Sequence, residues 1–70
     1  MNIGISENLE SAIALKKSGD AKRLLGDIQG ALSDFNRSLE IESGDLFALS
    51  GRGATKLLLQ DYSSALIDLR

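Results

Sequence analysis

Two stretches of the chain carry the same pattern, Gly19-Asp-Ala-Lys-Arg-Leu-Leu-Gly-Asp-Ile-Gln-Gly-Ala-Leu-Ser-Asp-Phe35 and Gly53-Ala-Thr-Lys-Leu-Leu-Leu-Gln-Asp-Tyr-Ser-Ser-Ala-Leu-Ile-Asp-Leu69. The second stretch follows the first by 34 positions, as from Gly19 to Gly53 or from Asp34 to Asp68. A fixed period of this size is typical of stacked structural repeats, in which each unit buries its apolar side against a neighbour. The sequence therefore predicts two copies of one supersecondary unit.

The composition favours helices and argues against several functional classes. The chain has no proline, cysteine or histidine, and its net charge is −2. It therefore lacks the thiolate and imidazole ligands typical of zinc sites and the histidine base that usually activates a serine nucleophile. No apolar run approaches the roughly 20 residues of a membrane span, and no signal peptide is visible. We expect a non-enzymatic cytoplasmic domain without cofactor or metal, and without a nucleic-acid or membrane partner.

Apolar residues recur at helical spacing, and capping residues divide this pattern into four segments. Gly26-Asp27 and Gln60-Asp61 are expected to form the turn within each copy, and Asp45 is expected to cap the helix that follows it. The predicted helices cover residues 7–25, 28–42, 46–59 and 62–70, after a flexible tail over residues 1–6.

A glycine stands inside the first and the third predicted helices, at Gly19 and at Gly53. Glycine within a helix costs about 1 kcal/mol relative to alanine, so its presence needs a reason. Because both glycines occupy the same position of the repeat, we expect another helix to pack closely against Gly19 and, by the same register, against Gly53. A glycine that is merely tolerated on the surface is the alternative.

A helical hairpin repeated every 34 residues resembles the tetratricopeptide repeat. The resemblance covers one full repeat, about residues 12–45, and most of a second, about residues 46–70, within a repeat domain over residues 7–70. It rests on a set of small, turn and large residues at matching positions, namely Gly19, Gly53, Gly26-Asp27, Ala31, Ala65, Phe35 and Leu69. The family's usual tryptophan, tyrosine and proline are replaced, by Leu15 and Leu49, by Lys22 and Lys56, and by Ser43.

The resemblance implies an all-α fold, with antiparallel helical hairpins stacked as a short right-handed solenoid of about four helices. A generic helical hairpin repeat or a four-helix bundle is the alternative. Repeats of this family form a concave groove, lined by the first helix of each hairpin, that holds peptides or partner helices in scaffolds and co-chaperones. By register, the partner-binding groove would include Ile13, Lys16, Asp20, Arg23, Phe47, Ser50, Ala54 and Leu57, together with Leu24 and Leu58.

The charge distribution is consistent with a mildly basic groove. Residues 12–25 and 46–59, which include the groove positions, hold six basic residues and one acid, whereas residues 28–42 and 62–70 hold two bases and four acids. Such a layer favours an acidic peptide as the partner. The alternative is that lysine and arginine side chains only solvate exposed faces. A carboxylate clamp of the co-chaperone type is disfavoured, because its two asparagines would fall on Asp20 and Gly51.

A second function remains open. The last predicted helix reaches Arg70, whereas its counterpart in the first copy continues to Glu42, so the apolar positions Leu66 and Leu69 have no following repeat to cover them. Uncovered repeat ends favour association. The chain is therefore expected either to belong with further repeats or to form a homodimer or domain swap through its C-terminal helix, as a self-associating assembly domain.

Overall fold

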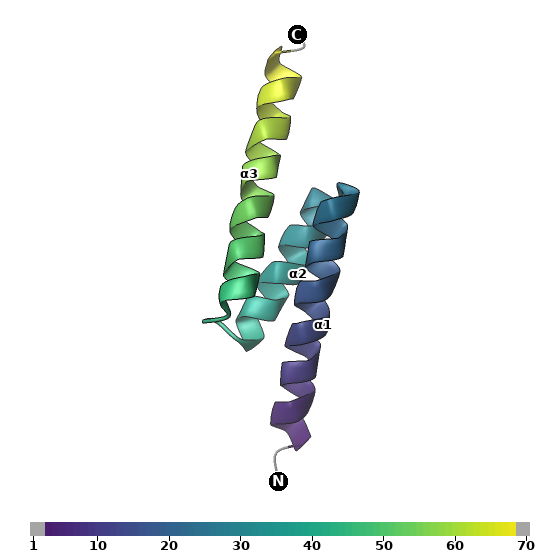
Figure 1. Cartoon of the computed structure of the whole chain (residues 1–70), viewed down its shortest axis with the longest axis vertical. Helices are drawn as coiled ribbons and strands as arrows, with labels where there is room; N and C mark the ends of the chain where they lie inside the picture. The colour runs from purple at the N-terminus through teal and green to yellow at the C-terminus, as the bar shows by residue number, and fades with distance from the viewer. Residues whose placement is uncertain (1–2, 69–70) are drawn as a thin grey trace.

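The computed structural model describes the backbone of residues 3–68 and the side chains of residues 8–63. The described chain forms three helices, α1 (Ile3–Leu25), α2 (Ile28–Ile41) and α3 (Leu46–Asp68) (Figure 1). The predicted all-α class is confirmed. The predicted solenoid of about four helices is wrong, because the third and fourth predicted helices are one continuous helix.

The two copies of the repeat differ at the position that should end their first helix. Gly26 ends α1 in the left-handed conformation, with φ +88°, and the N–H of Asp27 donates to the carbonyl of Lys22 at 2.8 Å. The equivalent residue in the second copy is Gln60, whose Cβ disfavours that conformation. Glutamine is also a good helix former, so α3 runs through Gln60-Asp61 without a turn.

The N-terminal end of α1 also differs from the prediction. Residues 1–6 were expected to form a flexible tail, but α1 begins at Ile3, four residues before the predicted start. Residues 1 and 2 lie outside the described part of the chain.

The α1–α2 hairpin follows the sequence closely. The side chain of Asp27 accepts a hydrogen bond from the N–H of Gly30 at 3.0 Å, which confirms the predicted cap of α2. The predicted apolar stripe of α2 faces inward, where Ala31, Phe35 and Leu39 are buried together with Ala48 of α3. Helix α2 thus packs against both of the other helices.

Phe35 is the centre of the core. Its side chain is fully buried, and its ring lies between Gly19 of α1 and Gly51 of α3. A Cβ on Gly19 would stand 3.2 Å from the ring, and one on Gly51 would overlap it. The close packing predicted at Gly19 is confirmed. The same prediction for Gly53 is wrong, because no atom would lie within 4 Å of a Cβ there.

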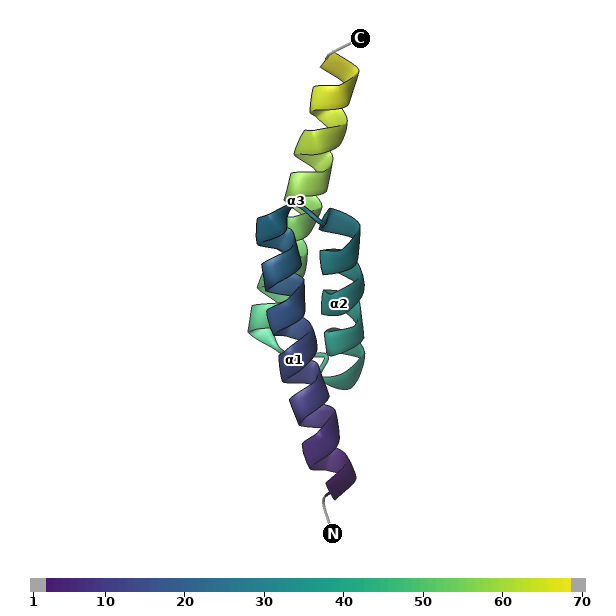
Figure 2. The ribbon, with the colours of Figure 1, turned by 90° about the vertical axis from the view of Figure 1, so that its right-hand side faces the viewer.

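The molecule is long and narrow, with principal extents of 58 × 19 × 13 Å. The N-terminal half of α1 extends past the hairpin at one end, and the C-terminal half of α3 extends past it at the other (Figures 1 and 2). Large parts of two helices are therefore left without a neighbour in the same chain.

Candidate functional site

A shallow cavity of about 240 Å³ lies between α1 and the first half of α3. Helix α2 holds these two helices through Phe35, which contacts a glycine on each. We call this cavity the α1–α3 groove. It is lined by Asp20, Arg23, Phe47, Ser50, Gly51 and Ala54.

Five of the eight positions predicted for the groove line this cavity, namely Asp20, Arg23, Phe47, Ser50 and Ala54. Lys16 lies at its edge, with its Nζ 5.7 Å from the centre of the Phe47 ring. Ile13 and Leu57 are exposed and do not line the groove. Leu24 and Leu58 line a different cavity, near the α1–α2 turn.

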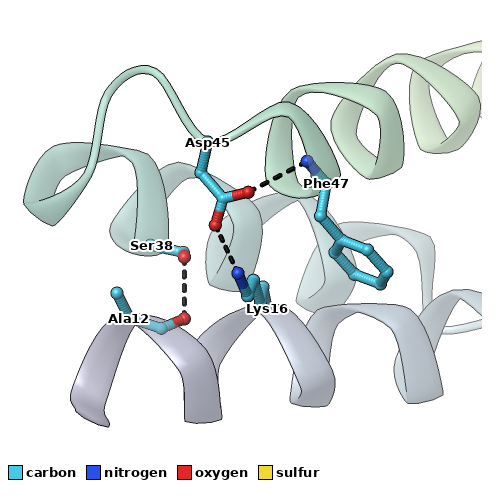
Figure 3. A network of polar contacts seen from close by, with 5 residues as sticks. All are labelled: Ala12, Lys16, Ser38, Asp45 and Phe47. Carbon is cyan, nitrogen blue, oxygen red and sulfur yellow. Dashed lines mark hydrogen bonds and ion pairs between the residues drawn. The ribbon is translucent and has the colours of Figure 1, made fainter. Parts of the chain in front are cut away.

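Each cation at the groove is paired with a carboxylate. Lys16 Nζ donates to Asp45 Oδ2 at 2.5 Å, and Arg23 Nη2 donates to Asp20 Oδ1 at 2.6 Å. Figure 3 shows the Lys16 ammonium pointing at Asp45, beside the ring of Phe47. The formal charges of these four side chains cancel, so the groove is not the basic surface that the sequence predicted.

Two further basic residues of the predicted layer, Lys22 and Arg52, do not line the groove either. Lys22 forms a 2.9 Å ion pair with Asp34 of α2, and Arg52 donates to the Asn36 side chain at 3.1 Å. Both contacts join a helix of the predicted basic layer to α2. Lys22 and Arg52 therefore bridge helices, which neither the basic groove nor simple solvation of an exposed face predicted.

Asp45 links Lys16 of α1 to Phe47 of α3. The sequence predicted this residue only as a helix cap. Its Oδ1 accepts the N–H of Phe47 at 2.9 Å, which confirms the predicted cap of α3, while Oδ2 receives Lys16. The hydrogen bond from Lys16 lowers the pKa of Asp45; partial burial opposes this effect and the Phe47 N–H adds to it. The cap therefore also fixes the start of α3, and with it Phe47, against α1.

Arg23 carries one buried polar atom that is not satisfied by any residue that the structure describes. Its Nε is buried and has no hydrogen-bond partner among the described residues. The guanidinium reaches Asp20 through Nη2 alone. Because an unpaired buried donor costs about 1–3 kcal/mol, an acceptor that reached Nε would be favoured at this end of the groove.

A larger apolar cleft of about 480 Å³ lies where α3 passes the α1–α2 turn. Its aliphatic lining is strongly exposed, especially Leu24 and Leu25. The residues that line it are Arg23, Leu24, Leu25, Gly26, Ile28, Leu58, Asp61 and Tyr62. The sequence assigned Leu24 and Leu58 to the groove by the register of the repeat, whereas both lie at this cleft.

Comparison of the chain with family models, curated proteins and solved structures found no match. The described helices include none with the length and apolar character that crossing a membrane requires.

Proposed function

We propose that this chain is a non-enzymatic protein-interaction module, whose α1–α3 groove binds a peptide or helix of a partner protein. The observation that carries the proposal is Phe47. This ring is 52% exposed and stands in a groove where Asp20, Arg23 and Ser50 offer hydrogen bonds. Exposed aromatic residues beside polar groups are typical anchors of protein interfaces.

The charges refine the kind of partner that we propose. A strongly acidic ligand would have to displace Asp20 from Arg23 or Asp45 from Lys16, so it would gain little net Coulomb energy. A segment with one apolar side chain against Phe47 and a single acceptor near Arg23 fits better. The acidic peptide expected from the sequence stays a prediction, as does the cytoplasmic setting.

The resemblance to the tetratricopeptide repeat is retained as a proposal for residues 12–45 alone. In this part of the chain, the helical hairpin, the glycine beneath an aromatic ring and the Asp27 cap support it. The groove itself is argued from the cavity and its side chains, and it does not depend on the family.

A peptide library displayed on phage and panned against the full chain tests the proposal. Peptides selected on the wild-type chain should bind the Phe47→Ala variant about tenfold or more weakly, since tenfold corresponds to about 1.4 kcal/mol of one lost anchor. The matched control is Leu25→Ala, which truncates an exposed residue of the apolar cleft. Binding lost on Leu25→Ala and kept on Phe47→Ala would assign the site to the cleft and contradict the proposal.

A further inference from the structure

Helix α3 carries an apolar face that points away from α1 and α2. We call it the open face, and it consists of Leu46, Leu49, Gly53 and Leu57. Spacings of three, four and four place these residues on one side of a helix. Leu46 is 77% exposed and Leu57 is 64% exposed, and nothing lies near Gly53. On the opposite side of α3, Ala48 and Thr55 are fully buried.

The repeat shows what covers the equivalent face in the first copy. One period earlier, the same positions on α1 are Ala12, Leu15, Gly19 and Arg23. Ala12 is fully buried, and its carbonyl accepts a hydrogen bond from Ser38 Oγ of α2 at 2.8 Å (Figure 3). Gly19 lies beneath Phe35 of α2. At Ala12 and Gly19, the face that is open on α3 is therefore covered by α2 on α1.

The segment equivalent to the start of α2 is present but cannot cover the open face of its own molecule. Residues 61–68 repeat the pattern of residues 27–34, and they continue α3 in a straight line past the hairpin (Figures 1 and 2). A continuous helix cannot pack against its own side. Residues 61–68 can therefore cover an open face only on another molecule.

We propose that a second copy of this chain binds the open face, with its residues 61–68 lying on α3 as the start of α2 lies on α1. In the α1–α2 hairpin, Gly19 packs against Phe35, and Lys22 pairs with Asp34. By the same register, position 56 of one copy lies beside position 68 of the other.

This register defines a symmetric dimer. The paired positions run in opposite directions around a midpoint near Asp61, so the two α3 helices lie antiparallel about a two-fold axis at that point. Residues 61–68 of each copy then cover the open face of the other copy. Lys56, the counterpart of Lys22, is exposed in one molecule and lies beside this shared surface.

The surface area of the chain is consistent with such a partner. A folded monomer of 7.5 kDa exposes roughly 4,200 Å². This chain exposes 4986 Å². The excess is close to the roughly 800 Å² that one partner contributes to a stable interface.

Sedimentation equilibrium of the full chain over a wide concentration range tests the dimer. The wild-type chain should dimerise. Gly53→Glu should raise the dimer dissociation constant about tenfold or more, because it places a charged side chain on the apolar open face that the second copy would bury. This change does not threaten the fold, because the site is open and glutamate is the better helix former. Gly44→Glu, in the exposed α2–α3 turn, is the matched control and should leave dimerisation unchanged. A wild-type chain that is monomeric at every concentration would overturn the proposal, as would equal effects of the two variants.

Cysteine cross-linking tests the geometry, and the chain is suited to it because it has no cysteine of its own. Gln60 lies beside the proposed two-fold axis and is exposed. Mild oxidation should link the Gln60→Cys variant into covalent dimers. It should leave the Glu10→Cys variant, whose site is also exposed, monomeric. Efficient linking of Glu10→Cys with none at Gln60→Cys would place the contact elsewhere and overturn the register. The open face shares no residue with the α1–α3 groove, so either proposal can fail alone.

Discussion

The ring of Phe35 in α2 lies so close to Gly51 of α3 that a Cβ at residue 51 would overlap it. Two positions further along the same helix, Gly53 faces open space. A larger residue at position 51 would therefore clash with the buried ring, whereas a larger residue at position 53 would not, although both positions lie on α3.

We predict opposite effects of alanine at these two glycines. Gly51→Ala should lower the free energy of unfolding by about 1–2 kcal/mol, because overpacking against the buried ring outweighs the gain in helix propensity. Gly53→Ala should raise it by about 1 kcal/mol, since only the propensity changes. Urea denaturation followed by circular dichroism measures both, at a concentration where the chain is monomeric. Stabilisation by Gly51→Ala would show that Phe35 does not pack where the structure places it.

A second prediction concerns the buried hydroxyl of Ser38, which donates to the carbonyl of Ala12. Replacing Ser38 with alanine removes this hydrogen bond between α2 and α1. The exposed Ser33 on the same helix is the matched control, because Ser33→Ala brings the same gain in helix propensity. Ser38→Ala should be less stable than Ser33→Ala by about 1 kcal/mol. Equal stability of the two variants would mean that the bond contributes nothing.

The third prediction is a loss of stability in acid that depends on Asp34. Burial raises the pKa of this carboxyl, but the hydrogen bonds from Ser18 and Lys22, with the charges of Lys22 and Arg37, outweigh it and hold the pKa below its ordinary value of 3.8. A carboxyl whose pKa is lower in the folded chain stabilises the fold above its unfolded pKa. This stabilisation is lost as the pH falls from about 3.8 towards the folded value.

Asp34→Asn separates this effect from the rest of the chain. The variant should be less stable near pH 7, by about 1–3 kcal/mol, because Lys22 loses its partner and the Ser18 hydroxyl keeps only a neutral acceptor. Below pH 3.8 the difference between the wild type and the variant should shrink. Thermal unfolding at a series of pH values measures this, and a difference that stays constant with pH would rule out Asp34 as the titrating group.

The fourth prediction concerns the link between Lys16 and Asp45. Lys16→Met keeps the length of the side chain and removes its charge, so the pKa of Asp45 should rise towards 3.8. The pKa of Asp34, which Lys16 does not contact, should not change. Carboxyl carbon shifts in an NMR titration report both groups at once. An unchanged pKa of Asp45 would show that the ion pair does not form in solution.

The first hairpin could be predicted from the sequence because its signals are local. Gly26 permits the left-handed turn, Asp27 caps the next helix, and the stripe through Ala31 and Phe35 defines the buried side of α2. Each of these signals acts within one or two turns of a helix. The second hairpin was predicted by analogy with the first, and the analogy fails at Gln60, where the glycine is missing.

The candidate site could be predicted only in part, for a related reason. The register of the repeat placed Arg23 and Phe47 at the same groove, and both residues line it. This succeeded because the first half of each repeat is helical, as expected. The charge balance could not be predicted, since it depends on which carboxylate each cation reaches. Lys16 and Asp45 are 29 positions apart, and only the packing of α3 against α1 brings them together.

The continuity of α3 is the claim on which the open face and the dimer depend. The most direct test is the backbone carbon chemical shifts of residues 56–66 in the wild-type chain, measured by NMR with amide exchange over the same segment. We predict helical shifts at every residue, Gln60 and Asp61 included. Non-helical shifts at Gln60-Asp61, with contacts between Ala65 and Gly53 in a monomer, would contradict this account and restore a second hairpin.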